Sequence, residues 1–248
     1  MDFYSASFSG GKDSTAMVLL LIKNHYPLDE VVFYDTGMEF SAIYNVVNYM
    51  ERLCKRRGIS FVRLYPQRPF LYDMLEKPVR SRSGSVKLGY AWCGGAVRWG
   101  TSEKVRLLDK HHREICALHK CNNIYVYVGI AADEKRRVKS DAACSGLVKL
   151  YPLIDLGYTE KMCLELCRKY NIRWLEYSIS GAIDLYDVLD RVSCWCCRNK
   201  NLKELKAIYR YLPDYWDKLR MLQTKIGMPF KPNASIFDLE QRFESESE

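Results

Sequence analysis

Short apolar runs alternate with longer segments of helical periodicity through the first two thirds of the chain. The apolar runs that predict strands occupy residues 3–8, 30–34, 59–64 and 123–129, with a short extended piece at 174–175. The segments that predict helices between them occupy residues 15–22, 41–57 and 101–118. Strands that alternate with helices are typical of a doubly wound sheet. We therefore predict an α/β, Rossmann-like fold with a mainly parallel, five-stranded sheet.

Two stretches depart from this alternation. Between residues 65 and 100 several prolines and the run RSRSGSVK at 80–87 predict a long loop. Beyond residue 181 a cysteine-rich stretch precedes helical segments at 201–211 and 215–224, and the tail ESESE is expected to be disordered. The predicted organisation is an α/β domain over 1–180 and a helical, cysteine-containing extension over 181–248 that packs on it.

The most informative stretch is SGGKDS at residues 9–14, which lies between the first predicted strand and the first predicted helix. A glycine pair allows close approach of the backbone to a ligand, and a helix start offers unpaired N–H groups and the positive end of its dipole. Lys12 adds a full positive charge, and Ser9 and Ser14 add hydroxyl groups. The stretch predicts a phosphate-binding loop, although its spacing is not that of the Walker P-loop.

Composition narrows the class of protein only slightly. The 248 residues carry a formal net charge of +8, which favours a polyanionic partner such as a nucleotide, tRNA or DNA. No run of about 18 apolar residues occurs, and the first residues do not have the pattern of a secretion signal, so we expect a cytoplasmic protein without a membrane partner. In that compartment the ten cysteines are expected to be thiols or metal ligands rather than disulfides.

Five motifs in order resemble the PP-loop adenine nucleotide alpha-hydrolase superfamily, in its sulfonucleotide (PAPS) reductase-like branch. They are SGGKDS at 9–14, DTGMEF at 35–40, Cys93 before a helix, GIAADEKRR at 129–137 and YPLID at 151–155, followed by the cysteines at 194–197. The resemblance implies a fold that binds ATP or an adenylyl sulfate at the carboxyl ends of the strands. Members split ATP between the alpha and beta phosphates.

The resemblance also implies roles for individual residues. The nucleotide-binding set is Ser9, Gly10, Gly11, Lys12, Asp13, Ser14, Asp35, Thr36, Gly129, Glu134 and Arg137. Within this set Lys12, Asp13 and Asp35 are the candidate catalytic residues. Lys12 would neutralise charge on the departing pyrophosphate, and Asp35 and Glu134 are candidates for holding Mg²⁺ or the nucleotide.

The remaining cysteines divide by context. Those in helical patterns (54, 116, 163 and 167) are expected to be packing residues, and the His and Cys residues between 111 and 121 are expected to reflect a helix C-terminus rather than zinc. By the resemblance, Cys93, Cys194, Cys196 and Cys197 are candidate ligands of a [4Fe-4S] cluster. Structural zinc stays open as the alternative, because C-x-x-C spacing does not discriminate between metals.

A departure from the family pattern decides between activities. Sulfonucleotide reductases carry a nucleophilic cysteine near the C-terminus, and no cysteine follows Cys197 here. The pattern then resembles the sulfur-inserting members, such as tRNA thiolases and the Dnd-type DNA phosphorothioation protein, with tRNA or DNA as acceptor and a sulfur-donor protein as a further partner. A reductase with an unusual nucleophile and a non-catalytic, metal-stapled nucleic-acid-binding module stay open as alternatives.

Overall fold

The protein is represented by a computed structural model that describes residues 2–80, 84–95, 97–138, 146–178 and 181–246. The chain forms two compact units. The sheet unit consists of Met1–Asp35, Ser41–Tyr65 and Lys104–Arg173. The cysteine-loop unit consists of Thr36–Phe40, Pro66–Glu103 and Trp174–Glu248. The division into an α/β domain over 1–180 and an extension over 181–248 stays a prediction.

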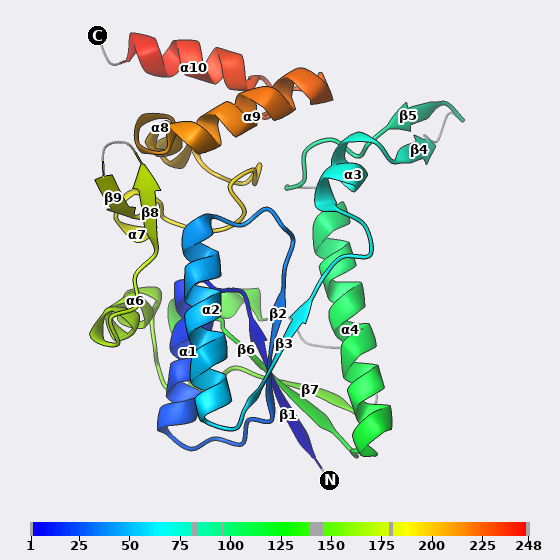
Figure 1. Ribbon diagram of the computed structural model, residues 1–248, viewed down its shortest axis with the longest axis vertical. Coiled ribbons are helices and arrows are strands. Elements are labelled where there is room, and N and C mark those ends of the chain that lie inside the picture. Colours follow the sequence, from blue (N-terminus) through cyan, green and yellow to red (C-terminus); the bar gives the residue numbers. More distant parts are fainter. Residues whose placement is uncertain (1, 81–83, 96, 139–145, 179–180, 247–248) are drawn as a thin grey trace. The chain divides into compact units, whose positions relative to one another are not determined.

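The sheet unit is built on five parallel strands in the order β3-β2-β1-β6-β7 (Figure 1). The strands are β1 (Phe3–Phe8), β2 (Glu30–Tyr34), β3 (Ser60–Leu64), β6 (Ile124–Val128) and β7 (Leu147–Leu150). The predicted five-stranded parallel sheet is confirmed. The fifth strand is β7, which the polarity of LVKL concealed, whereas residue 175 begins a separate hairpin.

The helices of this unit cover the sheet from both sides, as a doubly wound fold requires. They are α1 (Lys12–Lys23), α2 (Ser41–Arg56), α4 (Trp99–His119), α5 (Pro152–Asp155) and α6 (Glu160–Lys169), with a 3₁₀ turn η1 (Ala132–Arg137). In Figure 1, α1 and α2 lie on one side of the sheet and α4 on the other. Helix α1 packs on both β1 and α6, so all of TAMVLLL is buried.

Burial on both faces explains the almost continuous apolar sequence of β2. All five residues of β2 (EVVFY) are buried, because a parallel strand in the middle of the sheet has helices on both faces. The buried polar residue Glu30 at its start is paired with His111 of α4, with Nε2 3.1 Å from both carboxylate oxygens. This pair gives His111 a structural role between α4 and β2.

The cysteine-loop unit contains two small hairpins and a set of short helices. They are α3 (Phe70–Leu75), β4 (Pro78–Arg80), β5 (Val86–Leu88), β8 (Leu175–Ser178), β9 (Gly181–Asp184), α7 (Leu185–Val188), α8 (Leu202–Tyr211), α9 (Pro213–Ile226) and α10 (Ile236–Ser245). The loop predicted over 65–100 therefore contains a helix and a hairpin, although residues 81–83 and 96 lie outside the described part. The expected disorder of the tail is wrong for Glu244 and Ser245, which end α10.

Local signals account for the helix starts in this unit. Asn201 and Ser235 each form a capping box, in which the cap side chain accepts from the third helical N–H and that residue's carboxylate accepts in return. Trp216 of α9 and Phe243 of α10 pack with ring centroids 5.9 Å apart, which buries the inner faces of both helices. Within the described residues, no helix has the combined length and apolar character that a membrane crossing requires.

Candidate functional site

The loop SGGKDS joins the carboxyl end of β1 to α1, where the sequence placed it. Gly10 has φ of +76°, and a Cβ there would lie 2.8 Å from Cγ2 of Ile43. Both the conformation and the space therefore require glycine. Gly11 is the N-cap of α1 and provides no capping side chain, so no cap oxygen competes for the first-turn amides. These amides and the helix dipole favour an anion.

The two serines of the loop, Ser9 and Ser14, are hydrogen bonded to each other. The hydroxyl of Ser14 accepts a hydrogen bond from the backbone N–H of Ser9 at 3.2 Å and lies 3.0 Å from the hydroxyl of Ser9. It also donates to the carbonyl of Gly11 at 3.1 Å. These contacts hold the loop in shape without a ligand.

Lys12 is the buried cation of this loop. Its side chain is only 9% exposed, and its Nζ lies 2.5 Å from Oε2 of Glu160 and 3.1 Å from Oδ1 of Asp13. Burial acts to lower the pKa of Lys12, but Asp13 and Glu160 outweigh it and the pKa is raised. Burial raises the pKa of Asp13, against the attraction of Lys12. The ammonium is therefore charged and held in place before any phosphate arrives.

Glu160 is a site residue that sequence reasoning did not assign. The sequence showed it only as an acidic residue in the first turn of α6, which is an ordinary helix preference. The start of α6 is fixed by Thr159, whose hydroxyl accepts from the N–H of Met162 at 3.3 Å, and by Asp133, whose Oδ1 accepts from the N–H of Glu160 at 3.1 Å. No local pattern could have paired Glu160 with a residue 148 positions earlier.

The segment after β6 approaches the loop from the neighbouring strand. A Cβ on Gly129 would lie 3.0 Å from Cα of Ser14, so only glycine allows the two backbones to pack this closely. The charge of Glu134 contributes to the raised pKa of Asp13, which places Glu134 near the loop. Arg137 forms an ion pair with Glu134. Of the predicted nucleotide residues, Gly129, Glu134 and Arg137 thus belong to the surroundings of SGGKDS.

Asp35 and Thr36 are each engaged within their own unit. Asp35 follows β2, and its Oδ1 accepts a hydrogen bond from the hydroxyl of Tyr44 at 2.7 Å. Thr36 shapes the following turn: its hydroxyl accepts from the N–H of Met38 at 3.1 Å and donates to Oε1 of Glu39 at 3.1 Å. The role predicted for both residues at a nucleotide stays a prediction.

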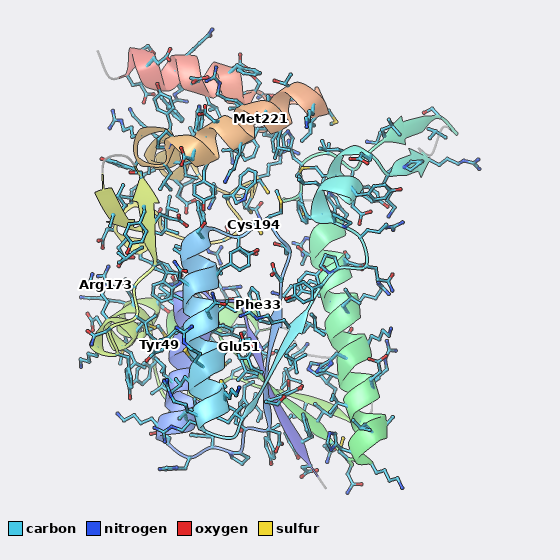
Figure 2. The ribbon with its side chains drawn as sticks, viewed as in Figure 1. Phe33, Tyr49, Glu51, Arg173, Cys194 and Met221 are labelled. Carbon is cyan, nitrogen blue, oxygen red and sulfur yellow. The ribbon has the colours of Figure 1, made fainter. Side chains whose placement is uncertain are left out.

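The second candidate site is the cysteine loop, defined as residues Cys194–Cys197 (Figure 2 labels Cys194). The N–H of Arg198 donates to the carbonyl of Cys93 at 3.3 Å, so the chain brings the distant cysteine beside the loop. Burial raises the pKa of the Cys93 thiol, and Cys197 raises it further. Burial likewise raises the pKa of Cys196, to which Cys197 and Cys93 add. Cys93 therefore lies near Cys196 and Cys197.

The DTGMEF segment, which comes much earlier in the chain, contacts the cysteine loop. The N–H of Trp195 donates to the carbonyl of Met38 at 3.1 Å, and the thiol of Cys194 donates to Oε1 of Glu39 at 3.4 Å. Burial, and then the charge of Glu39, raise the pKa of Cys194 well above its ordinary value. Within the described ranges, no three His, Cys, Asp or Glu side chains already stand in a metal-holding arrangement.

Lys200, three residues beyond the loop, is the unusual charge of this unit. The residue is 2% exposed, and its Nζ has no hydrogen-bond partner in the part of the chain that the structure describes. Burial lowers the pKa of Lys200, against the influence of Glu204 and the three thiols of the loop. The sequence offered no sign of this burial, because lysine is among the residues least often buried.

The other cysteines that the structure describes behave as packing residues, as expected. Cys54, Cys163 and Cys167 are 0% exposed, and burial raises the pKa of Cys54 and of Cys167 to about 12. The thiol of Cys116 donates to the carbonyl of Cys121 at 3.3 Å.

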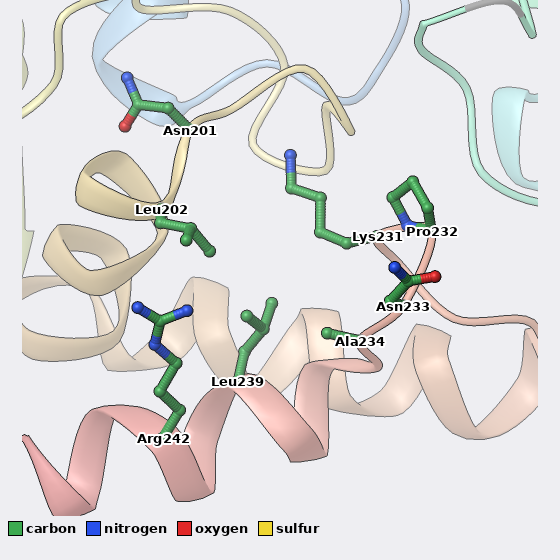
Figure 3. A pocket seen from close by; sticks show the side chains of 8 residues that line it. All are labelled: Asn201, Leu202, Lys231, Pro232, Asn233, Ala234, Leu239 and Arg242. Carbon is green, nitrogen blue, oxygen red and sulfur yellow. The ribbon is translucent and has the colours of Figure 1, made fainter.

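A hollow of about 490 Å³ lies between α8 and α10 and contains Lys231 and Arg242 (Figure 3). Both basic side chains are turned to protein acceptors. Lys231 Nζ donates to the carbonyls of Arg198 and Lys200, and Arg242 Nε donates to Glu246 at 2.8 Å. The hollow therefore presents mainly apolar and amide groups. The hydrogen bonds of Lys231 stabilise the segment that follows the cysteine loop.

Comparison with known proteins assigns the family. The model of the phosphoadenosine phosphosulfate reductase domain matches residues 4–176, which is most of the chain. The chain belongs to this family. The match covers SGGKDS, DTGMEF, Cys93, GIAADEKRR and YPLID, and it confirms the resemblance on which the nucleotide-binding residues were assigned. The cysteine loop lies beyond the matched region.

The similar curated proteins carry no described activity. The chain is 22% identical to Uncharacterized protein MJ0973 of Methanocaldococcus jannaschii over 216 residues, which cover 86% of this chain and 46% of that protein. It is 24% identical to Uncharacterized protein MJ0066 of the same organism over 221 residues, 86% of this chain and 39% of that protein. The chain thus spans less than half the length of these relatives.

Among solved structures, the chain resembles the U34-tRNA thiolase NcsA from Methanococcus maripaludis with its [4Fe-4S] cluster. The TM-score is 0.46 at 13% identity, with 99% of this chain and 72% of that chain covered. A likeness of this degree says nothing of the chemistry of this chain.

Proposed function

We propose that the protein is an ATP-dependent PP-loop enzyme that adenylates an acceptor, releases pyrophosphate and serves sulfur transfer to a nucleic acid or a small molecule. The observation that carries the proposal is the position of Lys12, a buried and charged ammonium at the start of α1 beside uncapped first-turn amides. Preorganised cations and amides of this kind stabilise charge that develops on phosphate oxygens.

In the proposed reaction, an oxygen of the acceptor attacks the alpha phosphorus of ATP and pyrophosphate leaves. Lys12 and the N–H groups of α1 take up the charge on the leaving phosphates, with Ser9 and Ser14 as further donors. Sulfide then forms a bond to the acceptor atom that carried this oxygen, and AMP leaves with the oxygen. The net change replaces a bond to oxygen by a bond to sulfur, and no electron is gained or lost overall.

The candidate holders of Mg²⁺ are Asp35 and Glu134, whose carboxylates are the type of ligand that this ion prefers. Asp35 lies at the end of β2, and Glu134 contributes to the field at Asp13. An ion held there would offset the negative charge of the phosphates.

The cysteine loop is the proposed metal centre, with Cys93, Cys194, Cys196 and Cys197 as ligands. The donor set fits a metal: the thiols of Cys93, Cys194 and Cys196 each lie within electrostatic range of Cys197, and a buried ammonium to which the described residues offer no hydrogen-bond partner lies near the last three thiols. A [4Fe-4S] centre there would supply a site that binds sulfide, whereas zinc would only fix the loop.

The test is the product pattern of ATP cleavage. Purified protein is incubated with ATP, Mg²⁺ and either a total tRNA mixture or duplex DNA, and the nucleotides are separated. AMP and pyrophosphate are expected, and Lys12→Ala should lose at least a hundredfold in rate. Lys23→Ala, an exposed lysine at the other end of α1, is the matched control and should keep full activity. Formation of ADP instead of AMP would overturn the proposal.

The second candidate function is reduction of an adenylyl sulfate, because the family model that matches the chain is that of such a reductase. It requires a thiolate that attacks the sulfate sulfur, yet burial raises the pKa of the thiols of Cys93, Cys194 and Cys196. Release of sulfite from adenylyl sulfate with reduced thioredoxin would favour this reaction, and its absence beside AMP formation would favour the first.

A further inference from the structure

Lys200 occupies a position that an ammonium rarely takes. It follows the cysteine loop and precedes α8 by two residues, and only 2% of it is exposed. The described residues give its Nζ no hydrogen-bond acceptor, and the Nζ lies 5.2 Å from the centroid of the Phe40 ring. A buried cation is tolerated where opposite charge or several acceptors compensate its lost hydration.

The neighbouring carboxylate of Glu204 provides this compensation only in part. Glu204 is 3% exposed, but its two oxygens accept from the backbone N–H groups of Arg191 and Asn201, each at 2.9 Å. These bonds belong to the start of α8, and within the described residues no ion pair of 4 Å or less joins Glu204 to Lys200. An attractive ring face offers less than a full negative charge.

The groups that remain are the thiols of the cysteine loop. The backbone N–H of Lys200 donates to the carbonyl of Cys197 at 3.2 Å, so the lysine directly adjoins the loop, and all three of its cysteines influence the ammonium electrostatically. Neutral thiols are weak acceptors and carry no net charge. Thiolates bound to a metal carry the negative charge that this pocket lacks. The mismatch of a buried cation with no acceptor disappears when the loop holds such a centre.

We propose that Lys200 is the buried counter-cation of an anionic metal–thiolate centre at the cysteine loop, and that it sets the metal retention and the reduction potential of that centre. The inference rests on the proposed function, because it takes the four cysteines as ligands. Lys231 has a different part: its Nζ donates to the carbonyls of Arg198 and Lys200 and holds the segment in place.

The test compares the effect of one substitution in the metal-free and in the metal-loaded full-length protein, where we expect it to act in opposite directions. In the metal-free, reduced protein, Lys200→Met removes an uncompensated buried charge and replaces it with an apolar side chain of similar length. The midpoint of thermal unfolding should therefore rise or stay unchanged. In the metal-loaded protein the same change removes the counter-charge, and metal retention should fall. A residue that merely packs would lower stability in both states.

The probes are iron with sulfide, and zinc alone, added anaerobically to the metal-free protein in parallel. With iron and sulfide, Lys200→Met should keep less than half the iron per chain after gel filtration, and the midpoint potential of what remains should become more negative. With zinc, a chelator should remove the metal from the variant at a concentration at least tenfold lower. Lys218→Met is the matched control. Lys218 is an exposed lysine of α9, and its Nζ lies 6.0 Å from the ring centroid of Trp195, a residue of the cysteine loop.

Equal retention and equal potential in Lys200→Met and in wild type would overturn the inference, as would loss of stability in the metal-free variant. Neither result touches the proposed function, which fails separately if ATP yields no AMP. Wild-type protein that takes up neither iron–sulfide nor zinc would also overturn the inference, and it would leave the adenylation step standing without its metal centre.

Discussion

Replacing Lys12 by methionine tests whether the ion cluster at SGGKDS is as tight as the structure shows. At about 3 Å and an effective dielectric constant of about 20, one ion pair is worth about 5 kcal/mol before desolvation. Removal of one partner from a buried pair typically costs about 3–5 kcal/mol. The side chains of Asp13 and Glu160 are 23% and 33% exposed, so water relieves part of this cost. We expect Lys12→Met to lower the free energy of unfolding by about 2 kcal/mol at pH 8.

The effect should depend on pH in one direction. The pKa of Asp13 is already raised by burial, and loss of Lys12 should raise it further. A carboxyl group with a raised pKa in the folded state stabilises the fold below its unfolded pKa, and this contribution is lost as the pH rises through the folded pKa. The penalty in Lys12→Met should therefore be largest at pH 8 and shrink toward pH 4, because the raised pKa of Asp13 lets its carboxyl group take up a proton as the pH falls.

Urea denaturation at pH 4, 6 and 8 measures this difference, and the slope of the unfolding curve checks that the same surface is exposed. The control is Lys110→Met, because Lys110 pairs with Glu114 at 3.6 Å with both side chains more than half exposed. Such a pair is worth about 0.5 kcal/mol or less. Equal stability of Lys12→Met and wild type at pH 8, or a deficit that does not shrink toward pH 4, would refute the reasoning.

Three further changes test other parts of the structure. Gly129→Ala places a methyl group 3.0 Å from Cα of Ser14, and the resulting strain of about 1–3 kcal/mol should weaken ATP binding several-fold in isothermal titration calorimetry; unchanged affinity would contradict the close packing. The hydrogen bond to Glu30 raises the pKa of His111, so the stability it contributes is present below about pH 6.5 and lost as the pH rises through the raised pKa. His111→Gln should therefore cost about 1 kcal/mol at pH 6 and less at pH 9, and a urea series with a constant difference would speak against this pair. Cys196→Ser should at least halve the metal per chain in anaerobically purified protein, while serine at either buried cysteine of α6 should leave the metal content unchanged.

The sequence by itself was sufficient for the fold class. Periods of two and of 3.6 residues are local properties, so β1, α1, β2 and α2 could be predicted from short windows. The phosphate loop was equally local, because its glycines, lysine and helix start are contiguous. Its place at the carboxyl end of a strand followed from the order of the elements. The signal failed where a strand is short and polar, as in β7, whose pairing with β6 depends on the neighbouring strand rather than on its own residues.

Only the tertiary structure decided how the charges are compensated. Glu160 reaches Lys12 because α6 packs on α1, and Lys200 is buried with its Nζ 5.2 Å from the centroid of the Phe40 ring. Neither pairing has a local signature, because residues far apart in the chain meet only when the elements pack. Hydration lost on burial then decides whether an ion stays charged and what it needs beside it. The order of the residues determined which groups are present; packing determined which of them compensate one another.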